Sequence, residues 1–145
     1  MRVDEILPYE LYYQDKRFKV KIPNYKKGEV VYKCGDNIYK PLSNGYFQQL
    51  QSIHSKGINE YPKTKAHDLR GKNVLISKTF YYFGSNPLNI PDALDDLKVG
   101  HGYKNKFSPE TTTAFIKFIF KQTTGIKSHP TIWPQNDNSW KIAKS

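Results

Sequence analysis

Apolar and polar residues alternate in short segments along this chain, and no single period runs through it. Residues 73–83 carry apolar side chains at both even- and odd-numbered positions, which point to opposite faces of a strand. This pattern predicts a strand covered on both faces and placed at the centre of the core. Residues 1–7 and 29–34 are rich in aliphatic and β-branched residues, and each predicts a further short strand. The sheet is therefore expected to form around residues 73–83.

Helical spacing occurs in two short stretches of the first half. Tyr9, Tyr12 and Tyr13 lie at i, i+3 and i+4, which predicts one helical turn after Pro8. Residues 46–53 place apolar side chains at the same spacing and predict a short amphipathic helix. The polar residues 54–72 contain many turn formers and predict a loop, and loops of that length are usually functional or flexible.

The second half contains two helix starts. Pro91 precedes acidic residues, which is typical of a first helical turn. Ser108 and Pro109 predict an N-cap and N1 position for a helix that runs to about residue 122, with Gly125 beyond its end. The apolar stripe of this helix is expected to pack in the core and contains Phe115, Ile116, Phe118 and Ile119.

These elements together predict an α+β fold. We expect a small mixed or barrel-like β-sheet with two or three flanking helices, because the strands are short and the helices few. Residues 1–129 are predicted to form a single α+β domain. Residues 130–145 are predicted to be a polar C-terminal arm or tail that contains Trp133 and Trp140.

The chain of 145 residues carries 23 Lys and Arg against 13 Asp and Glu, a formal net charge of +10. Basic residues exceed acidic ones by similar margins in each third of the sequence, so a basic patch must be assembled by folding. Such a charge favours polyanionic partners, nucleic acid among them. No apolar run of about 18 residues predicts a membrane span, and the N-terminal residues do not resemble a signal peptide. We therefore expect a cytoplasmic protein.

Several classes of chemistry lack their motifs. The sequence has no phosphate-binding P-loop, no dinucleotide-binding glycine motif and no serine hydrolase elbow. Cys34 is the single cysteine, which excludes an internal disulfide and suits a reducing compartment. It is interpreted as a buried thiol at a strand end, with a nucleophilic role as the alternative. A zinc site requires His54, His67, Asp68 and His101 to converge, so we predict no metal and no cofactor.

Two histidines are candidates for chemistry. His54 follows the helix predicted at 46–53, where it either caps the helix or acts as a ligand or catalytic group. His101 lies between two glycines, and the loop around it offers an imidazole and lysines to a phosphate or is only a turn. The aromatic residues 80–83 either fill the core or present a ring for stacking on a base.

The sequence resembles the second nucleotide modification-associated domain family, whose members are described as DNA base hypermodification proteins of bacteria and their phages. The resemblance covers most of residues 1–121 in order. The segments that carry it are Asp36-Asn37-Ile38-Tyr39, residues 48–55, Val74-Leu75-Ile76-Ser77, Phe80-Tyr81-Tyr82-Phe83-Gly84, Ile90-Pro91 and the loop from Gly100 to Lys104.

Two departures from the family pattern occur. Family members carry an upstream segment with a further strand, and residues 1–7 resemble the strand that follows it, so this chain is expected to lack that part. Where the family favours Gly-His-Lys, this sequence has Gly102-Tyr103-Lys104, with His101 one position out of register. The upstream strand pattern resembles small β-barrels of the pseudouridine-synthase-associated type, a likeness of fold only.

The resemblance and the residues together predict binding of nucleic acid or a modified nucleotide within a DNA base modification system. The alternative is an enzyme that acts on a nucleotide or DNA base, with His54, Asp36 or His101 as acid or base. A third possibility is a subunit that recruits a modifying enzyme. A homodimer is a further candidate, because an uncovered sheet edge favours pairing. The predicted nucleotide-binding residues are Asp36, Asn37, Tyr39, Gln48, His54, Tyr81, Tyr82 and His101, and the predicted phosphate-binding residues are Lys98, Lys104 and Lys106.

Overall fold

The computed structural model describes residues 1–55, 60–101 and 104–144. The chain divides into two compact units. Unit 1 comprises Met1–Thr79 and Trp133–Ser145, and unit 2 comprises Phe80–Ile132. Short strands and helices occur in both, which confirms the α+β class. The described strands form three separate two-stranded sheets that close no barrel, so the likeness to a pseudouridine-synthase-associated barrel stays a prediction.

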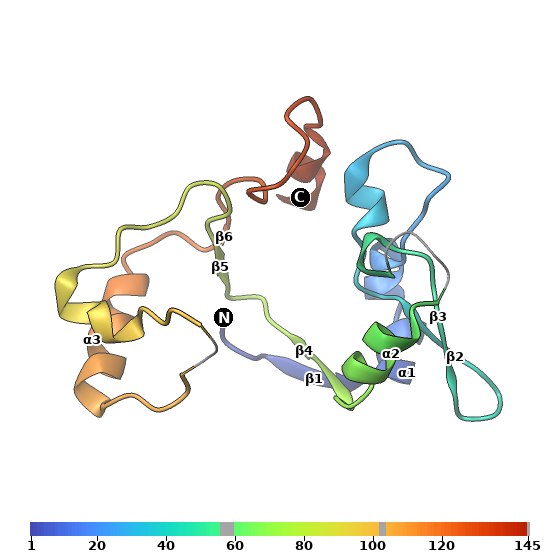
Figure 1. Ribbon diagram of the computed structural model, residues 1–145, viewed down its shortest axis with the longest axis horizontal. Helices are drawn as coiled ribbons and strands as arrows, with labels where there is room; N and C mark the ends of the chain where they lie inside the picture. The colour runs from blue at the N-terminus through green and yellow to red at the C-terminus, as the bar shows by residue number, and fades with distance from the viewer. Residues whose placement is uncertain (56–59, 102–103, 145) are drawn as a thin grey trace. The chain divides into compact units, whose positions relative to one another are not determined.

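Two antiparallel strand pairs occur among the described residues of unit 1 (Figure 1). Strand β1 (Glu5–Pro8) pairs with β4 (Asn73–Ile76), so the N-terminal segment lies beside a strand almost seventy positions later in the chain. Strands β2 (Tyr39–Pro41) and β3 (Phe47–Gln49) form a hairpin. Gly45 has a φ of +77° in its turn, a conformation that glycine adopts without the steric cost of a Cβ.

The helical segments of unit 1 are short. Helix α1 (Tyr9–Gln14) follows β1 directly and confirms the turn predicted from the tyrosine spacing, and Tyr12 is its buried residue. Helix α2 (Pro62–Asp68) begins with a proline, which is favourable at the first helical position. The remaining segments are the 3-10 helices η1 (Lys16–Lys21), η2 (Val30–Lys33), η3 (Ile53–Ser55) and η5 (Ser139–Lys144).

The core of unit 1 is small and partly polar. Tyr12, Ile38 and Tyr39 are each 4% exposed. The ring of Tyr9 meets that of Tyr39 edge to face at a centroid distance of 5.4 Å, a favourable aromatic geometry. Asn37 is buried and donates its amide to the backbone carbonyls of Tyr12 and Phe18. In the described parts of the chain every buried side-chain polar atom has a hydrogen-bond partner, as burial of polar groups requires.

The C-terminal segment docks on η2 within unit 1. Asp137 Oδ2 accepts from the backbone N–H of Val30 at 2.9 Å, and Ser139 Oγ accepts from the N–H of Val31 at 3.2 Å. These are the first N–H groups of η2, which have no partner inside the helix. Trp133 donates its indole N–H to the carbonyl of Asp137, which is a hydrogen bond within the C-terminal segment.

The described residues of unit 2 form one parallel strand pair and two helical segments. Strand β5 (Tyr81–Tyr82) pairs with β6 (Gly125–Ile126), and η4 (Asp92–Leu97) contributes the buried Leu94. Ser108 caps α3 (Pro109–Ile119) by accepting from the N–H of Thr111, as predicted. Gly84 has a φ of +59°, and a Cβ there would lie 2.2 Å from the carbonyl oxygen of His129, so only glycine fits this position.

The strand prediction for residues 73–83 was wrong. Residues 73–76 form β4 and residues 81–82 form β5, in different units. Strand β4 pairs only with β1 among the described strands, and Leu75 is 51% exposed, so it is not a central strand covered on both faces. Ser77 interrupts the run, because its hydroxyl accepts from Thr79 N–H and donates to the Thr79 carbonyl in place of ladder bonds.

Four further expectations were wrong. Residues 30–33 form η2 rather than a strand, because their N–H groups bond the C-terminal segment instead of a neighbouring strand. Residues 47–49 form β3 rather than a helix, because they pair with β2. The loop predicted at 54–72 contains η3 and α2. Helix α3 has no buried residue, and Phe115 and Ile116 are 40% and 43% exposed, so its stripe does not lie in a core.

Candidate functional site

A cavity of about 730 Å³ opens in unit 1. Its size lies within the range of about 300–1,000 Å³ that is usual for small-molecule sites. Helix α1, the segment that leads into β2, helix α2 and strand β4 all contribute to its wall. The lining residues are Tyr9, Tyr12, Asp36, Ile38, Tyr39, His54, Thr64, His67, Asp68, Gly71, Asn73 and Val74.

Asp68 is fixed at the end of α2 by two tyrosines. The hydroxyl of Tyr39 donates to Asp68 Oδ2 at 2.7 Å, and the hydroxyl of Tyr9 donates to the Asp68 carbonyl at 3.2 Å. The buried Gln49 donates its amide to the Tyr39 oxygen and accepts from the N–H of Tyr61. The Tyr39 hydroxyl thus has a partner on each side, and its bond holds one oxygen of the Asp68 carboxylate in place.

Asp36 is held in the same way from α1. The hydroxyl of Tyr12 donates to Asp36 Oδ1 at 2.7 Å, and Lys21 approaches Oδ2 at 3.5 Å. The ion pair with Lys21 is exposed on both sides, so it contributes little to stability. The hydrogen bond from the Tyr12 hydroxyl instead orients the carboxylate, and one side of Asp36 stays accessible from the cavity.

Both tyrosines stay protonated at neutral pH. Burial, followed by the bond to Asp36, raises the pKa of Tyr12 well above its ordinary value. Burial and the bond to Asp68 raise the pKa of Tyr39 in the same direction. Neither hydroxyl is therefore suited to act as a base near pH 7, and both act as donors that orient carboxylates.

Two imidazoles reach the same cavity. His54 belongs to η3 and is exposed. His67 lies on α2, with its Nδ1 against a guanidinium nitrogen of Arg70. Because a guanidinium can only donate, this contact makes Nδ1 of His67 the acceptor and leaves its Nε2 to carry the proton. Although His54, His67 and Asp68 line one cavity, no group of three or more metal-binding side chains within residues 1–55, 60–101 and 104–144 is placed to hold an ion.

The cavity combines fixed acceptors with an apolar wall. The Asp36 and Asp68 carboxylates accept hydrogen bonds, and Ile38 and Val74 supply apolar surface beside them. A planar ligand with N–H or NH₂ groups on its edge matches this set, because a carboxylate accepts from such donors strongly and directionally. Nucleobases present edges of this kind.

The sequence prediction grouped five residues of unit 1, and three of them meet here: Asp36, Tyr39 and His54. The remaining two lie outside the cavity lining. Asn37 is buried and its amide bonds the backbone, which gives it a structural task. Gln48 is exposed on β3, whereas its neighbour Gln49 points inward and supports Tyr39.

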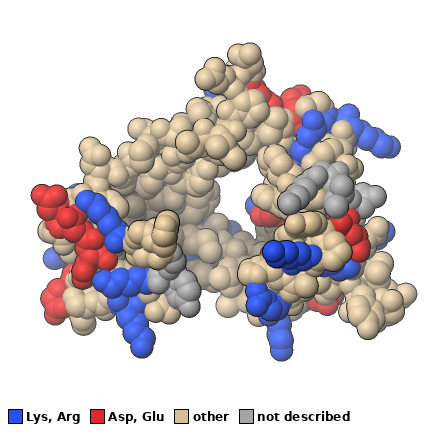
Figure 2. All heavy atoms as spheres, viewed as in Figure 1, with Lys and Arg blue, Asp and Glu red and all other residues tan. Residues whose placement is uncertain are grey.

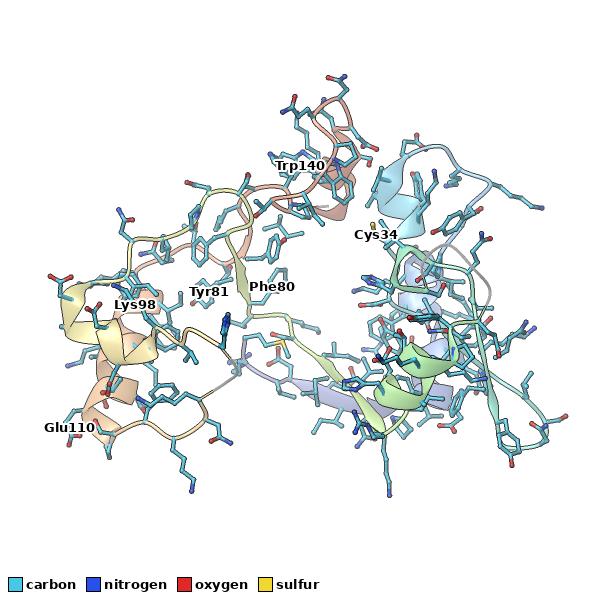
Figure 3. All side chains as sticks on the ribbon, in the orientation of Figure 1. Cys34, Phe80, Tyr81, Lys98, Glu110 and Trp140 are labelled. Carbon is cyan, nitrogen blue, oxygen red and sulfur yellow. The ribbon has the colours of Figure 1, made fainter. Side chains whose placement is uncertain are left out.

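The other predicted residues belong to unit 2. Tyr81, which Figure 3 labels, and Tyr82 form β5. Tyr82 is 42% exposed. Lys98 pairs with Asp95 at 2.6 Å and Lys104 with Asp96 at 3.4 Å. In Figure 2 basic and acidic side chains gather together over this unit, so these lysines are partly neutralised. His101 and Lys106 are exposed, and the residues of the predicted loop at Gly102 and Tyr103 lie outside the described residues.

The sequence prediction missed the contribution of α2. His67 was considered only as a zinc ligand or an exposed loop residue and Asp68 only as a zinc ligand, and Thr64 was not considered. His67 is exposed but lies on α2 rather than in a loop. A signal was present, because Pro62 followed by Gly71 matches the preference for proline at the start of a helix and glycine just beyond its end. Tyr9 and Tyr12 were recognised as helical, but their hydroxyl partners are distant in sequence and follow only from the fold.

A family model described as nucleotide modification associated domain 2 matches residues 1–137, nearly the whole chain. No curated protein and no solved structure matches the chain significantly. The cavity of unit 1 and its tyrosine-bound carboxylates lie entirely within the matched residues. No helix in the described ranges combines the length and apolarity needed to cross a membrane.

Proposed function

The chain belongs to the nucleotide modification associated domain 2 family, and on this premise we propose that unit 1 binds a nucleotide or a nucleic-acid base within a DNA base modification system. The observation that carries the proposal is the cavity in which tyrosine hydroxyls orient Asp36 and Asp68. These carboxylates accept hydrogen bonds from the N–H groups of a base edge. His54 adds an imidazole to the same wall.

A binding titration tests this proposal. The full chain is titrated by calorimetry with the four deoxynucleoside monophosphates and with 5-hydroxymethyl-dCMP. We expect saturable binding of at least one of them. Asp68→Asn keeps the shape of the side chain and the bond from Tyr39 but removes the charge, so it weakens binding about 10- to 100-fold, as loss of a charged hydrogen bond does.

Asp92→Asn is the matched control. Asp92 is exposed in unit 2 and does not line the cavity, so its substitution leaves the affinity unchanged. Absence of binding by every probe at millimolar concentration, or equal loss in both variants, contradicts the proposed function.

An enzyme is the second candidate, because Asp36 and His54 line one cavity, as acid–base catalysis on a bound base requires. Mass spectrometry of nucleotides incubated with the chain tests it. A new mass that disappears in His54→Ala while binding persists supports catalysis, and an unchanged nucleotide leaves binding as the function.

A further inference from the structure

A second cavity lies against the first in unit 1. It measures about 540 Å³ and is built by helix α2 and the residues that flank it. Thr64 and His67 line both cavities, so these two side chains form a common wall. The lining residues of the second cavity are Tyr61, Lys63, Thr64, Ala66, His67 and Arg70.

The two cavities have opposite charge. The charged side chains of the first are Asp36 and Asp68, whereas those of the second are Lys63 and Arg70. Within the part of the chain that the structure describes, no acidic residue lines the second cavity, and neither Lys63 nor Arg70 forms an ion pair. A ligand with an anionic end and an end rich in N–H donors therefore has one favourable orientation across α2.

The donors of the second cavity suit a phosphate group. Arg70 contacts Nδ1 of His67, which leaves the Nε2–H of His67 as a donor beside the guanidinium. Thr64 supplies a hydroxyl on the same helix face, three residues before His67. A guanidinium, an ammonium, a hydroxyl and an imidazole N–H form a set that is typical of phosphate recognition.

We propose that Lys63, Thr64, His67 and Arg70 form a phosphate subsite, so that unit 1 takes a nucleoside monophosphate with its base toward Asp36 and Asp68 and its phosphate over α2. The inference rests on the proposed function and deepens it, because it assigns the phosphate contacts to α2. It differs from the sequence prediction, which placed these contacts at Lys98, Lys104 and Lys106. Two of those lysines are paired with acidic residues, whereas Lys63 and Arg70 form no ion pair with any residue that the structure describes.

The test compares deoxynucleosides with their 5′-monophosphates, and inorganic phosphate alone, by calorimetry on the full chain. We expect the monophosphate to bind about tenfold tighter than the nucleoside or more, as charged hydrogen bonds to phosphate provide. The double variant Lys63→Ala/Arg70→Ala removes this preference and keeps the affinity for the nucleoside. The matched double variant Lys26→Ala/Lys40→Ala, at two exposed lysines of the same unit, keeps the preference.

The outcomes separate the two proposals. Nucleoside binding with no gain from phosphate, or with a gain that survives in Lys63→Ala/Arg70→Ala, overturns the phosphate subsite and leaves the proposed function intact. Loss of the preference in both double variants also overturns it, because the effect then follows net charge rather than α2. Absence of binding by nucleosides and monophosphates overturns both proposals. Circular dichroism of each variant verifies that it is folded.

Discussion

At the scale of single residues, the cavity of unit 1 depends on two tyrosine hydroxyls that hold carboxylates in place. Tyr39 is 4% exposed and its oxygen joins two groups, since it donates to Asp68 and accepts from Gln49 while its ring packs on Tyr9. The hydroxyl therefore has a structural role in the core and a positioning role at the cavity. Removing it leaves buried polar groups without a partner, which costs more than the bond itself contributes.

Tyr39→Phe is expected to lower the free energy of unfolding by about 1–3 kcal/mol, because the Gln49 amide and one oxygen of Asp68 lose their partner. Urea denaturation followed by circular dichroism measures the change. Tyr46→Phe in the same hairpin is the matched control, since Tyr46 is 71% exposed, and we expect it to change stability by less than about 0.5 kcal/mol. Equal effects of the two substitutions contradict the role assigned to Tyr39.

The same tyrosines predict the behaviour at alkaline pH. The pKa values of Tyr12 and Tyr39 are raised in the folded state, first by burial and then by their carboxylate partners. The folded state therefore binds these protons more tightly than the unfolded state. The free energy of unfolding that this difference contributes is fully present below the ordinary tyrosine pKa of 10.0. Stability is expected to fall as pH rises from about 10 upward, because only the unfolded chain ionises there.

Urea denaturation at pH 8, 9, 10 and 11 measures this dependence. The double variant Tyr12→Phe/Tyr39→Phe is expected to lose less stability between pH 9 and 11 than the original chain, because it lacks both titrating hydroxyls. An identical pH dependence in the two proteins would show that other groups, such as lysines, cause the alkaline loss.

At the scale of secondary-structure elements, the C-terminal segment completes η2. Asp137 and Ser139 accept from the first N–H groups of η2, more than one hundred positions earlier in the chain. A 3-10 helix of four residues has few bonds of its own, so these outside partners decide whether it forms. Cys34 lies at the end of η2 (Figure 3), and burial together with the nearby Asp137 raises the pKa of its thiol, which makes a nucleophilic role unfavourable at neutral pH.

Asp137→Ala is expected to destabilise unit 1 by about 0.5–2 kcal/mol, as loss of a helix-capping side chain does. Hydrogen exchange measured by mass spectrometry should show faster exchange in peptides that cover residues 30–33. The neighbouring substitution Asn136→Ala, at an exposed position, is expected to leave exchange there unchanged. Slow exchange at residues 30–33 in Asp137→Ala would contradict the capping role.

The elements also show what a sequence can predict. Ser108 and the Tyr9–Tyr12 spacing act within one helical turn, so α3 and α1 were predicted correctly. Residues 30–33 take the conformation that the distant C-terminal segment provides, and residues 47–49 take the one that the hairpin partner β2 provides. Their local patterns predicted a strand and a helix instead. In the site, Asp36, Tyr39 and His54 were found from their chemistry, whereas Asp68 required the fold to bring α2 against β2.

At the scale of the whole molecule, the positive charge is concentrated in one unit. Unit 1 holds 17 Lys and Arg against 9 Asp and Glu, whereas unit 2 holds 6 against 4. The net excess of +8 against +2 lies in the unit that contains the candidate cavity. If the chain contacts DNA as well as a single nucleotide, electrostatic attraction directs the phosphate backbone to unit 1.

Charge reversal in unit 1 is therefore expected to weaken DNA binding more than reversal in unit 2. Lys40→Glu/Lys72→Glu changes two exposed lysines of unit 1, and Lys117→Glu/Lys121→Glu changes two exposed lysines of α3 and its end. Both double variants change the net charge by the same amount. A difference between their affinities for DNA therefore shows that the position of the lysines matters. Fluorescence anisotropy with a labelled single-stranded oligonucleotide at several salt concentrations measures affinity and its salt dependence.

For single-stranded DNA, removal of one lysine–phosphate ion pair reduces the slope of log K against log salt by about 0.7, so the unit 1 variant should have a slope smaller by about 0.7–1.4. The unit 2 variant should retain the original slope, because its lysines do not touch the strand. Equal slopes in the two variants would mean that DNA responds only to the total charge of +10. A larger effect of the unit 2 variant would assign DNA binding to α3, whose apolar residues Phe115 and Ile116 are exposed beside those lysines.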